Sequence, residues 1–398
     1  MEIENLYMYR KQHSNLESKL QLRTIVYLVN SLRKAGPVNV LYDIISHLDQ
    51  SHYRVYIVKF LEDDLERSIT ARFKELGVKV ISLSCSFIRL ELCTKSIAKQ
   101  VNNLMRKIQP DVIHTHGYHP VLVASYLREW KRIETLHCVC QEDFIFSKGR
   151  IVGGYMIRRY LRALRKMDHC AAISHTVKRA YLPILGERKI TVVYNGCDIR
   201  QFSPLSQEQI IQKKRELNIP EGCRIYVIVG ALSVRKNPLI VVQSFIELYF
   251  QKQLSEPTLV LFFGIGDLMK ECMQMAQEYP FIQFKGYQMN VAEYMQIADY
   301  SICASRSEGF GLNYVESLMV NVPVIGSDIQ PFQEFTEMLP ALQVLQFKVD
   351  DKEGLKQAIV KSQQLQLDKA VLGEMARKTF SAQNMSDGYV QLYEQFWH

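Results

Sequence analysis

Short apolar runs alternate with helix-like segments along almost the whole chain, and this alternation limits the fold more than any other feature. The runs are strand length and rich in β-branched residues, as in Thr24–Val29, Arg132–Leu136 and Ile225–Val229. The segments between them carry apolar residues at the spacing of amphipathic helices. Near-continuous apolar strands that alternate with helices are typical of parallel sheets covered on both faces. The sequence therefore predicts an α/β protein with doubly wound parallel sheets.

The alternation is interrupted by the polar passage Ser203–Glu208 and then restarts. A chain of 398 residues also exceeds the usual size of one hydrophobic core. We therefore predict two Rossmann-like domains of the same class. The predicted extents are 1–22 for an N-terminal appendage, 23–203 for the first domain, 204–380 for the second domain and 381–398 for a C-terminal amphipathic helix.

The composition excludes several classes of protein. Hydrophobic residues make up 47% and charged residues 23% of the chain, as in soluble globular proteins. No apolar run reaches the roughly 18 residues of a membrane span, and the first residues lack the pattern of a secretory signal. The nine cysteines show no Cys-x-x-Cys spacing, so we expect reduced thiols in the cytoplasm. The net charge of +8 is not gathered into basic blocks with aromatic residues, so nucleic acid is not an expected partner.

Two glutamates, Glu308 and Glu316, flank a Gly-Phe-Gly turn at 309–311. The apolar run Tyr300–Ala304 precedes the turn, and the predicted helix Leu312–Val320 follows it. A strand, a glycine turn and a helix N-terminus together offer free backbone N–H groups to an anion. The carboxylates would repel that anion, but they can accept hydrogen bonds from hydroxyl groups. A pyrophosphate with a sugar on each side, as in a nucleotide-sugar, meets both demands.

Basic side chains and histidines follow other predicted strands. Arg235 and Lys236 lie between a strand and a helix, where two cations suit a diphosphate. His116 and His137 each close an earlier strand. Because ligands of parallel sheets bind beyond the carboxyl ends of the strands, we expect these residues to face one cleft between the domains. The pair His114 and His116 has no third ligand at a suitable spacing, so no metal site is predicted.

These motifs resemble, in order and spacing, those of the family 4 retaining glycosyltransferases with a GT-B fold. Glu308 and Glu316 match the E-x7-E signature of that family. The other matching motifs are Thr135-Leu136-His137, Glu142-Asp143-Phe144, Ala171-Ala172-Ile173-Ser174, Val193 to Asp198, Gly230 with Arg235 to Pro238, Gly264-Ile265-Gly266 and Phe284 to Tyr287. The resemblance covers residues 23 to 398. It implies two domains that face each other across a cleft, with the last helix crossing back onto the first domain.

The resemblance also implies roles for individual residues. The catalytic residues would be His137, Glu308 and Lys236, and His116 would lie on the acceptor side. The residues expected to bind the donor are Gly36, Arg235, Lys236, Gly264, Gly286, Tyr287, Glu308, Gly309, Phe310, Gly311, Leu312 and Glu316. Ala231 stands where many family members carry an arginine, which leaves more of the phosphate charge to Lys236.

The reaction implied is transfer of a hexosyl group from a nucleoside diphosphate sugar to a hydroxyl acceptor, with retention and without a metal ion or other cofactor. The expected acceptor is a saccharide or a lipid-linked precursor of a surface polysaccharide. The alternatives are a nucleotide-sugar epimerase, a phosphorylase, and a non-catalytic sugar-binding subunit of a glycosyltransferase complex.

The predicted helix Ile151–Met167 carries Arg158, Arg162 and Arg165 on one side. These arginines are either a solvated outer face or a contact with anionic lipid, which would make the chain a peripheral protein at the inner face of the membrane. Two segments of the first domain, Ser84–Leu92 and Cys138–Gly154, are expected to be loops that select the acceptor.

Overall fold

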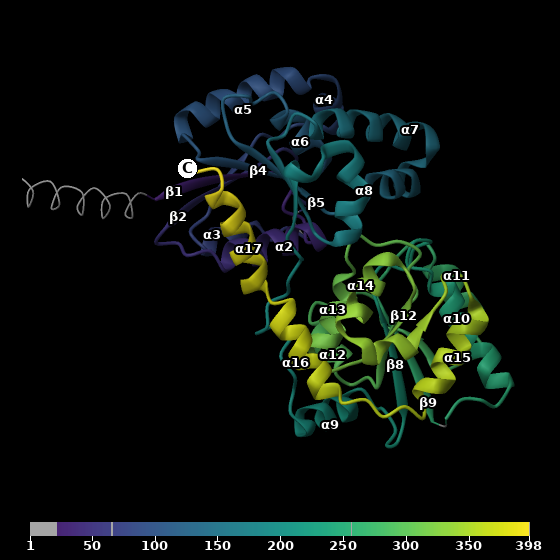
Figure 1. The fold of residues 1–398 in the computed structure, drawn as a ribbon. Helices are drawn as coiled ribbons and strands as arrows, with labels where there is room; N and C mark the ends of the chain where they lie inside the picture. Colours follow the sequence, from purple (N-terminus) through teal and green to yellow (C-terminus); the bar gives the residue numbers. More distant parts are fainter. Residues whose placement is uncertain (1–21, 65–66, 256, 398) are drawn as a thin grey trace, which may run out of the picture.

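The structure is a computed structural model that describes residues 22–64, 67–255 and 257–397. Apart from Leu22, the predicted N-terminal appendage lies outside the described residues. The described chain forms two parallel sheets with helices packed on them, one above the other in Figure 1. The predicted pair of doubly wound parallel sheets is thus confirmed. None of the described helices is long and apolar enough to cross a membrane.

The first sheet has seven strands in the order β3-β2-β1-β4-β5-β6-β7, and all of its neighbouring pairs are parallel. Its strands are β1 Arg23–Val29, β2 Tyr53–Lys59, β3 Lys79–Ser82, β4 Val112–His116, β5 Arg132–Leu136, β6 His169–Ala172 and β7 Ile190–Val192. Its helices are α2 Gly36–Ser46, α3 Thr70–Glu75, α4 Phe87–Leu92, α5 Thr94–Ile108, α6 Tyr118–Ala124, α7 Cys140–Leu164, α8 His175–Leu185 and the 3-10 helix η1 Glu187–Lys189.

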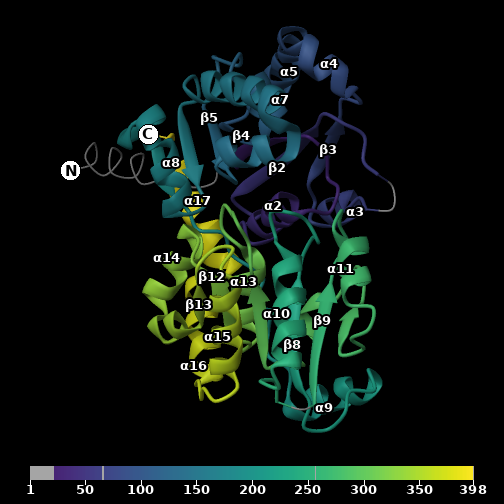
Figure 2. The ribbon, with the colours of Figure 1, turned by 90° about the vertical axis from the view of Figure 1, so that its right-hand side faces the viewer.

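The second sheet has six parallel strands in the order β10-β9-β8-β11-β12-β13. Its strands are β8 Arg224–Val229, β9 Thr258–Phe263, β10 Ile282–Phe284, β11 Tyr300–Cys303, β12 Val324–Ser327 and β13 Gln346–Phe347. The helices of this half are α9 Gln207–Glu216, α10 Pro238–Phe250, α11 Met269–Met275, α12 Val291–Met295, α13 Leu312–Met319, α14 Gln330–Met338, η2 Pro340–Leu345, α15 Lys352–Ser362 and α16 Lys369–Thr379. Figure 2 shows this half below the first.

Each sheet has one point at which the strand order reverses, between β1 and β4 in the first sheet and between β8 and β11 in the second. At such a point, the segments that follow the two neighbouring strands run to opposite faces of the sheet. A crevice therefore opens at the carboxyl ends of these two strands. The predicted residues that follow β4, β8 and β11 lie at these two crevices. The topology therefore gives each domain one natural place for a ligand.

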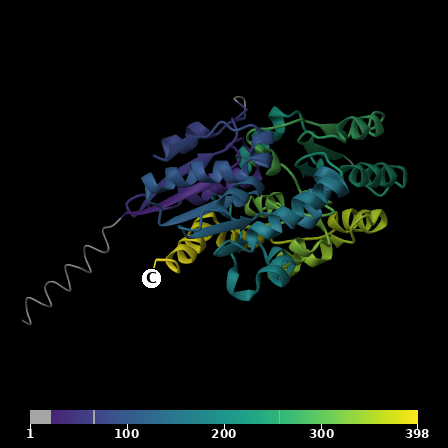
Figure 3. The ribbon, with the colours of Figure 1, turned by 90° about the horizontal axis from the view of Figure 1, so that it is seen from above.

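The last helix, α17 (Ala382–Glu394), returns to the first domain. Figure 3 shows its yellow ribbon beside the purple and blue elements. Tyr393 OH lies 2.9 Å from Tyr27 OH and 2.7 Å from His114 Nδ1, and Tyr389 OH lies 2.9 Å from Thr135 Oγ1. These buried hydroxyls join α17 to the centre of the first sheet.

The structure corrects the prediction that Ser84–Leu92 and Cys138–Gly154 are loops. Phe87–Leu92 forms α4, and Cys140–Gly154 belongs to α7, which has one non-helical residue at Gly149 (φ 75°). Both helices expose many of their apolar residues. Their apolar pattern is therefore not the buried stripe by which an amphipathic helix is recognised in a sequence.

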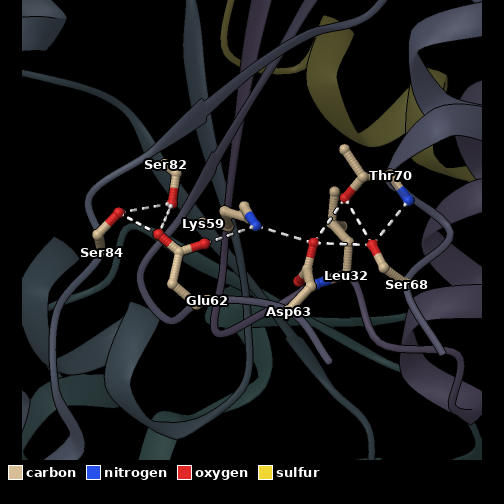
Figure 4. Close-up of polar contacts among 8 residues, drawn as sticks. All are labelled: Leu32, Lys59, Glu62, Asp63, Ser68, Thr70, Ser82 and Ser84. Carbon is tan, nitrogen blue, oxygen red and sulfur yellow. Dashed lines mark hydrogen bonds and ion pairs between the residues drawn. The ribbon is translucent and has the colours of Figure 1, made fainter. Parts of the chain in front are cut away.

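A buried carboxylate fixes the segment that follows β1 (Figure 4). Asp63 accepts hydrogen bonds from Leu32 N (2.7 Å), Ser68 Oγ (2.9 Å) and Thr70 Oγ1 (2.6 Å), and it pairs with Lys59 Nζ at 2.8 Å. Burial alone would raise the pKa of Asp63, but these partners lower it below its ordinary value. The network holds the β1–α2 segment, which lines a cavity of about 450 Å³ in the first domain.

Candidate active site

Glu308 lies in the segment that joins β11 to α13, at the centre of a charge cluster. Its Oε1 lies 2.6 Å from Lys236 Nζ, and its Oε2 accepts a hydrogen bond of 2.6 Å from Arg235 Nη1. Ser305 Oγ donates to Oε1 over 2.9 Å. The side chain of Glu308 is only 8% exposed. Burial would raise its pKa, but the charges of Lys236 and Arg235 lower it, so Glu308 is an anion held by two cations.

Both cations come from the segment between β8 and α10. Asn237 adopts a left-handed conformation (φ 54°), and Pro238 then occupies the first turn of α10, where a missing N–H costs little. Arg235 Nη1 also donates to Ser307 O over 3.0 Å. Lys236 Nζ has a second partner in Asn313 Oδ1 at 3.4 Å. Since an ammonium has three N–H groups, one N–H of Lys236 has no partner among the described residues.

Two positions of the turn at 309–311 admit only glycine, Gly309 because it packs against the first domain and Gly311 because it packs against α14 of its own domain. A Cβ on Gly309 would lie 2.1 Å from the carbonyl oxygen of His137, and one on Gly311 would lie 2.4 Å from Phe332. Gly311 also has a φ of 98°, which favours glycine. Ser174 Oγ of the first domain donates to Gly309 O over 2.8 Å. The two domains therefore meet at this turn and position it together.

Phe310, between the two glycines, is a core residue. Its side chain is buried, and its ring lies 5.1 Å from Phe335 and 5.8 Å from Phe380. Only the backbone of Phe310 is therefore open to a ligand contact. The start of α13 has no side-chain cap, so its first backbone N–H groups stay available at the cleft.

Glu316 faces the first domain across a cavity of about 50 Å³, which Asp43 of α2 and Arg72 also line. Burial raises the pKa of Glu316 to about 7, although the charge of Lys236 lowers it. Burial, followed by the charges of Asp198 and Glu316, raises the pKa of Asp43 to about 8. Glu316 and Asp43 come from different domains and line the same small cavity. Both carboxyl groups therefore titrate near neutral pH.

A larger cavity of about 450 Å³ lies at the carboxyl ends of β1, β4 and β5 in the first domain. His116 and His137 line it, with His116 Nδ1 2.9 Å from His137 Nε2. Burial lowers the pKa of His137 to about 4. Burial and the two neighbouring histidines lower the pKa of His116 well below its ordinary value, so both rings are neutral. His116 Nε2 is buried and has no hydrogen-bond partner among the described residues.

Glu134, next to this cavity on β5, is absent from the predicted site. Tyr160 OH donates to its carboxyl over 2.8 Å, Gly117 N donates over 3.3 Å, and Thr115 Oγ1 is a third partner. Burial raises the pKa of Glu134 to about 8, although these bonds lower it. A glutamate in the middle of an apolar strand was the sequence signal that could have identified it. Tyr160 lines the cavity, so Glu134 helps to shape its wall.

His114 is a structural residue. Its Nδ1 contacts Tyr393 OH, and its Nε2 lies 2.8 Å from Thr135 Oγ1. Burial lowers its pKa to about 3, so the ring is neutral. No group of three His, Cys, Asp or Glu side chains suited to a metal ion occurs within residues 22–64, 67–255 and 257–397. Metal-independent activity remains a prediction.

The predicted glycines of the second domain follow neighbouring strands. A Cβ on Gly264 would lie 1.9 Å from Gly230 O, and Gly264 N donates to Gly286 O over 2.7 Å. Gly264 also has a φ of 140°. These close approaches explain the glycines by packing at the strand ends, and contact with a nucleotide base remains a prediction.

Two further predicted residues lie where the domains face each other. A Cβ on Gly36 would lie 3.9 Å from Leu312 Cδ1, so the β1–α2 turn touches the start of α13. Tyr287 is 56% exposed, and its ring lies 5.9 Å from Lys34 Nζ of the first domain. Gly36 and Tyr287 thus lie where the two domains face each other, and the ligand contacts of the predicted residues stay predictions.

Two family models match the chain in tandem. The model described as Glycosyltransferase Family 4 matches residues 35–201, and the model described as Glycosyl transferases group 1 matches residues 209–378. Each model covers most of one domain, and the two models follow one another in the same order as the two domains along the chain.

Similar proteins agree with these matches. The O-antigen biosynthesis glycosyltransferase WclY of Escherichia coli is 23% identical over 325 residues, which cover 79% of this chain and 83% of WclY. The N-acetyl-alpha-D-glucosaminyl L-malate synthase of Bacillus anthracis is 23% identical over 313 residues, 76% of this chain and 78% of that protein. The structure of Anabaena HepE in complex with UDP and glucose has a TM-score of 0.75 at 15% identity and covers 94% of this chain and 100% of HepE.

The likeness to HepE shows the fold, which is the two-domain GT-B architecture. The tandem family models extend over both domains and leave out few of the described residues. The chain therefore belongs to the family 4 glycosyltransferases.

Proposed function

We propose that this glycosyltransferase moves a hexosyl group from a nucleoside diphosphate sugar to a hydroxyl of a saccharide or lipid-linked acceptor, with retention and without a metal ion. The observation that supports the donor class most directly is the cluster of Lys236, Arg235 and Glu308. It lies beside a glycine turn that touches the backbone of His137 from the other domain. Cations, backbone N–H groups and a carboxylate in one place suit a phosphate joined to a sugar.

The free bonding capacity of this cluster defines where a donor would bind. A carboxylate has about four acceptor positions. Glu308 uses three of them for Lys236, Arg235 and Ser305, which leaves one on Oε2 for a sugar hydroxyl. The remaining N–H of Lys236 would donate to a phosphate oxygen. Glu316, on the other side of α13, would accept bonds from the ribose hydroxyls when it is ionised.

Retention follows from a front-face path in this proposal. The bond between the anomeric carbon and the leaving phosphate oxygen breaks, and a bond to the acceptor oxygen forms on the same face of the sugar. The acceptor hydroxyl gives its proton to the departing phosphate. Lys236 and Arg235 stabilise the negative charge that develops on that phosphate, and fixed cations are effective there because they need no reorganisation. His137 would orient the sugar.

The larger cavity supports an acceptor site in the first domain. Its volume of about 450 Å³ fits a sugar-sized group, and several of its walls are apolar or aromatic, including Val38, Leu41 and Phe144. His116 lines this cavity together with other polar residues such as Asn30 and Ser31, which can contact hydroxyl groups of a saccharide. The names of the two relatives indicate different acceptors, an O-antigen in one case and L-malate in the other. We infer a saccharide or lipid-linked acceptor because the cavity has a volume of about 450 Å³ and combines apolar walls with polar side chains, as a sugar ring and its hydroxyls require.

The test is to incubate the purified chain with a panel of nucleoside diphosphate sugars, with and without short free or lipid-linked saccharides. Release of the nucleoside diphosphate measures transfer, and NMR of the product gives the anomeric configuration. We expect acceptor-dependent release, a retained configuration and the same rate with EDTA. An inverted product or a loss of activity with EDTA would contradict the mechanism. Epimerisation of the donor alone would indicate the alternative enzyme class, and no turnover of any donor would favour a non-catalytic subunit.

A further inference from the structure

Helix α4 presents apolar side chains to solvent. Ile88 and Leu92 are 69% and 79% exposed, and Phe87 is also exposed, whereas Leu90 faces the core. A six-residue helix that carries large apolar residues on its outer side does not gain stability from them in water. Such a surface is favourable only where something apolar covers it.

The middle of α7 extends the same surface. Ile151 is 89% exposed, and Val152 and Tyr155 are exposed as well. Arg159 joins the two helices, because its guanidinium pairs with Glu91 of α4 and donates to Tyr155 OH over 3.1 Å. We call these six side chains, Phe87, Ile88, Leu92, Ile151, Val152 and Tyr155, the α4–α7 face. The two helices lie together in the upper part of Figures 1 and 2.

The α4–α7 face is rigidly held. Glu91 also pairs with His119 Nε2 at 2.9 Å, and Arg159 Nη2 donates to Thr94 Oγ1 over 3.0 Å. The ring of Phe87 packs edge-on against His119 at 5.0 Å. Glu91 of α4 and Arg159 of α7 are thus used for internal bonds, whereas Phe87, Ile88 and Leu92 stay at the surface.

Cations continue the α4–α7 face along α7. Arg158 and Arg162 are exposed, and the 3.6-residue period places them on the same side of α7 as Ile151 and Tyr155, while the exposed Lys166 follows just after the end of α7. An apolar surface with a basic stripe beside it matches the acyl region and the anionic headgroups of a phospholipid leaflet.

The α4–α7 face is also connected to the larger cavity. Phe87 contacts His119, His119 contacts Tyr118, and Tyr118 contacts Phe144, with ring centroids 5.0, 4.9 and 5.5 Å apart. Tyr118 and Phe144 line the cavity. A lipid tail at the α4–α7 face would therefore lie beside the site at which we place the acceptor hydroxyl.

We propose that the α4–α7 face inserts into the headgroup region of an anionic phospholipid membrane, with Arg158, Arg162 and Lys166 contacting the lipid phosphates. The inference rests on the proposed function only in so far as it brings a lipid-linked acceptor to the cavity. Membrane binding itself requires neither donor nor acceptor, so its failure and a failure of transfer can be told apart.

The experiment is co-sedimentation of the full chain with vesicles of phosphatidylcholine alone or with phosphatidylglycerol. The test variant is Ile88→Ser, Leu92→Ser, Ile151→Ser, which removes the three most exposed apolar groups. The matched control, Phe250→Ser, Met273→Ser, Val371→Ser, removes exposed apolar groups from the second domain. We expect the wild type and the control to bind anionic vesicles, and the test variant to lose at least about tenfold in partition coefficient.

Charge is tested separately. Arg158→Gln and Arg162→Gln should each lower the partition coefficient about fivefold, and raised salt should do the same. Equal binding of the wild type and the test variant, equal binding to neutral and anionic vesicles, or no binding at all would overturn the proposal. Light scattering without lipid completes the test. A wild-type dimer that the test variant dissociates, without vesicle binding, would show that a second copy of the chain covers the α4–α7 face instead.

Discussion

Lys236 Nζ lies 2.6 Å from Glu308 Oε1, and both side chains are largely buried at the carboxyl ends of β8 and β11. Each charge is buried only because the other is present, since an unpaired buried charge is costly. Arg235 completes the cluster on the second carboxylate oxygen. The charged groups that we propose contact the donor phosphate and sugar are therefore already held in place before a donor binds.

Replacing Lys236 by alanine should lower the transfer rate at least about tenfold, since the variant loses a charge-assisted contact to the donor phosphate worth roughly 1.4 kcal/mol or more. The measurement is initial rate with a saturating acceptor. Lys270→Ala, an exposed lysine of α11, is the control and should leave the rate unchanged. Wild-type rates in Lys236→Ala would contradict the placement of the donor phosphate.

The two carboxyl groups between the domains should make the stability depend on pH. In the folded chain the pKa of Glu316 is raised from 4.5 to about 7 and that of Asp43 from 3.8 to about 8. Over this range the folded chain binds more protons than the unfolded chain, so these groups lower the free energy of unfolding as the pH rises toward 8. The buried histidines, whose pKa values are lowered, act in the opposite direction but only below about their ordinary value of 6.5.

The check is urea denaturation between pH 6.5 and 8, above the range in which the histidines act. Glu316→Gln and Asp43→Asn should each gain stability relative to the wild type as the pH rises, because each variant has one buried carboxyl group fewer to ionise. Glu221→Gln, at an exposed position, should show a constant difference from the wild type. A difference that does not change with pH in the two test variants would show that the pKa values are not raised.

Glu334 of α14 should be important for joining the domains. Its carboxylate accepts hydrogen bonds from the backbone N–H groups of His175 (3.0 Å) and Thr176 (2.5 Å), in the first turn of α8 in the first domain. Glu334→Ala leaves these donors unpaired and should lower the free energy of unfolding by about 1–3 kcal/mol. Hydrogen exchange at both amides should accelerate. Glu337→Ala, one turn on and exposed, should do neither, and slow exchange in Glu334→Ala would refute the contact.

Tyr393→Phe should weaken the attachment of α17. The hydroxyl lies 2.9 Å from Tyr27 OH and 2.7 Å from His114 Nδ1, and both partners are fully buried. Its loss leaves polar groups without partners, at a cost of about 1–3 kcal/mol in the free energy of unfolding. Chemical denaturation measures this, with Tyr249→Phe, a 47% exposed residue, as the matched control. Equal stability of the two variants would mean that water replaces the lost hydroxyl.

Several elements could be predicted from the sequence because their signal is local. β5 has the predicted bounds Arg132–Leu136. β1, β8 and α13 differ by one residue at one end from the predicted Thr24–Val29, Ile225–Val229 and Leu312–Val320. A strand buried on both faces is a continuous apolar run, and Pro238 marks the start of α10. The same reasoning was wrong for α4 and the first part of α7, because their apolar residues face outward and form no buried stripe.

The sequence by itself determined the fold class and which chemical groups stand at the ends of the strands, since both depend on residues close together along the chain. Only the tertiary structure decided which of these groups meet. Glu308 pairs with cations from another strand end, Glu316 faces Asp43 of the other domain, and Glu134 is buried beside Tyr160. Burial and charge at each carboxyl group depend on distant segments that folding brings together, so their pKa values and partners cannot be found from local pattern alone.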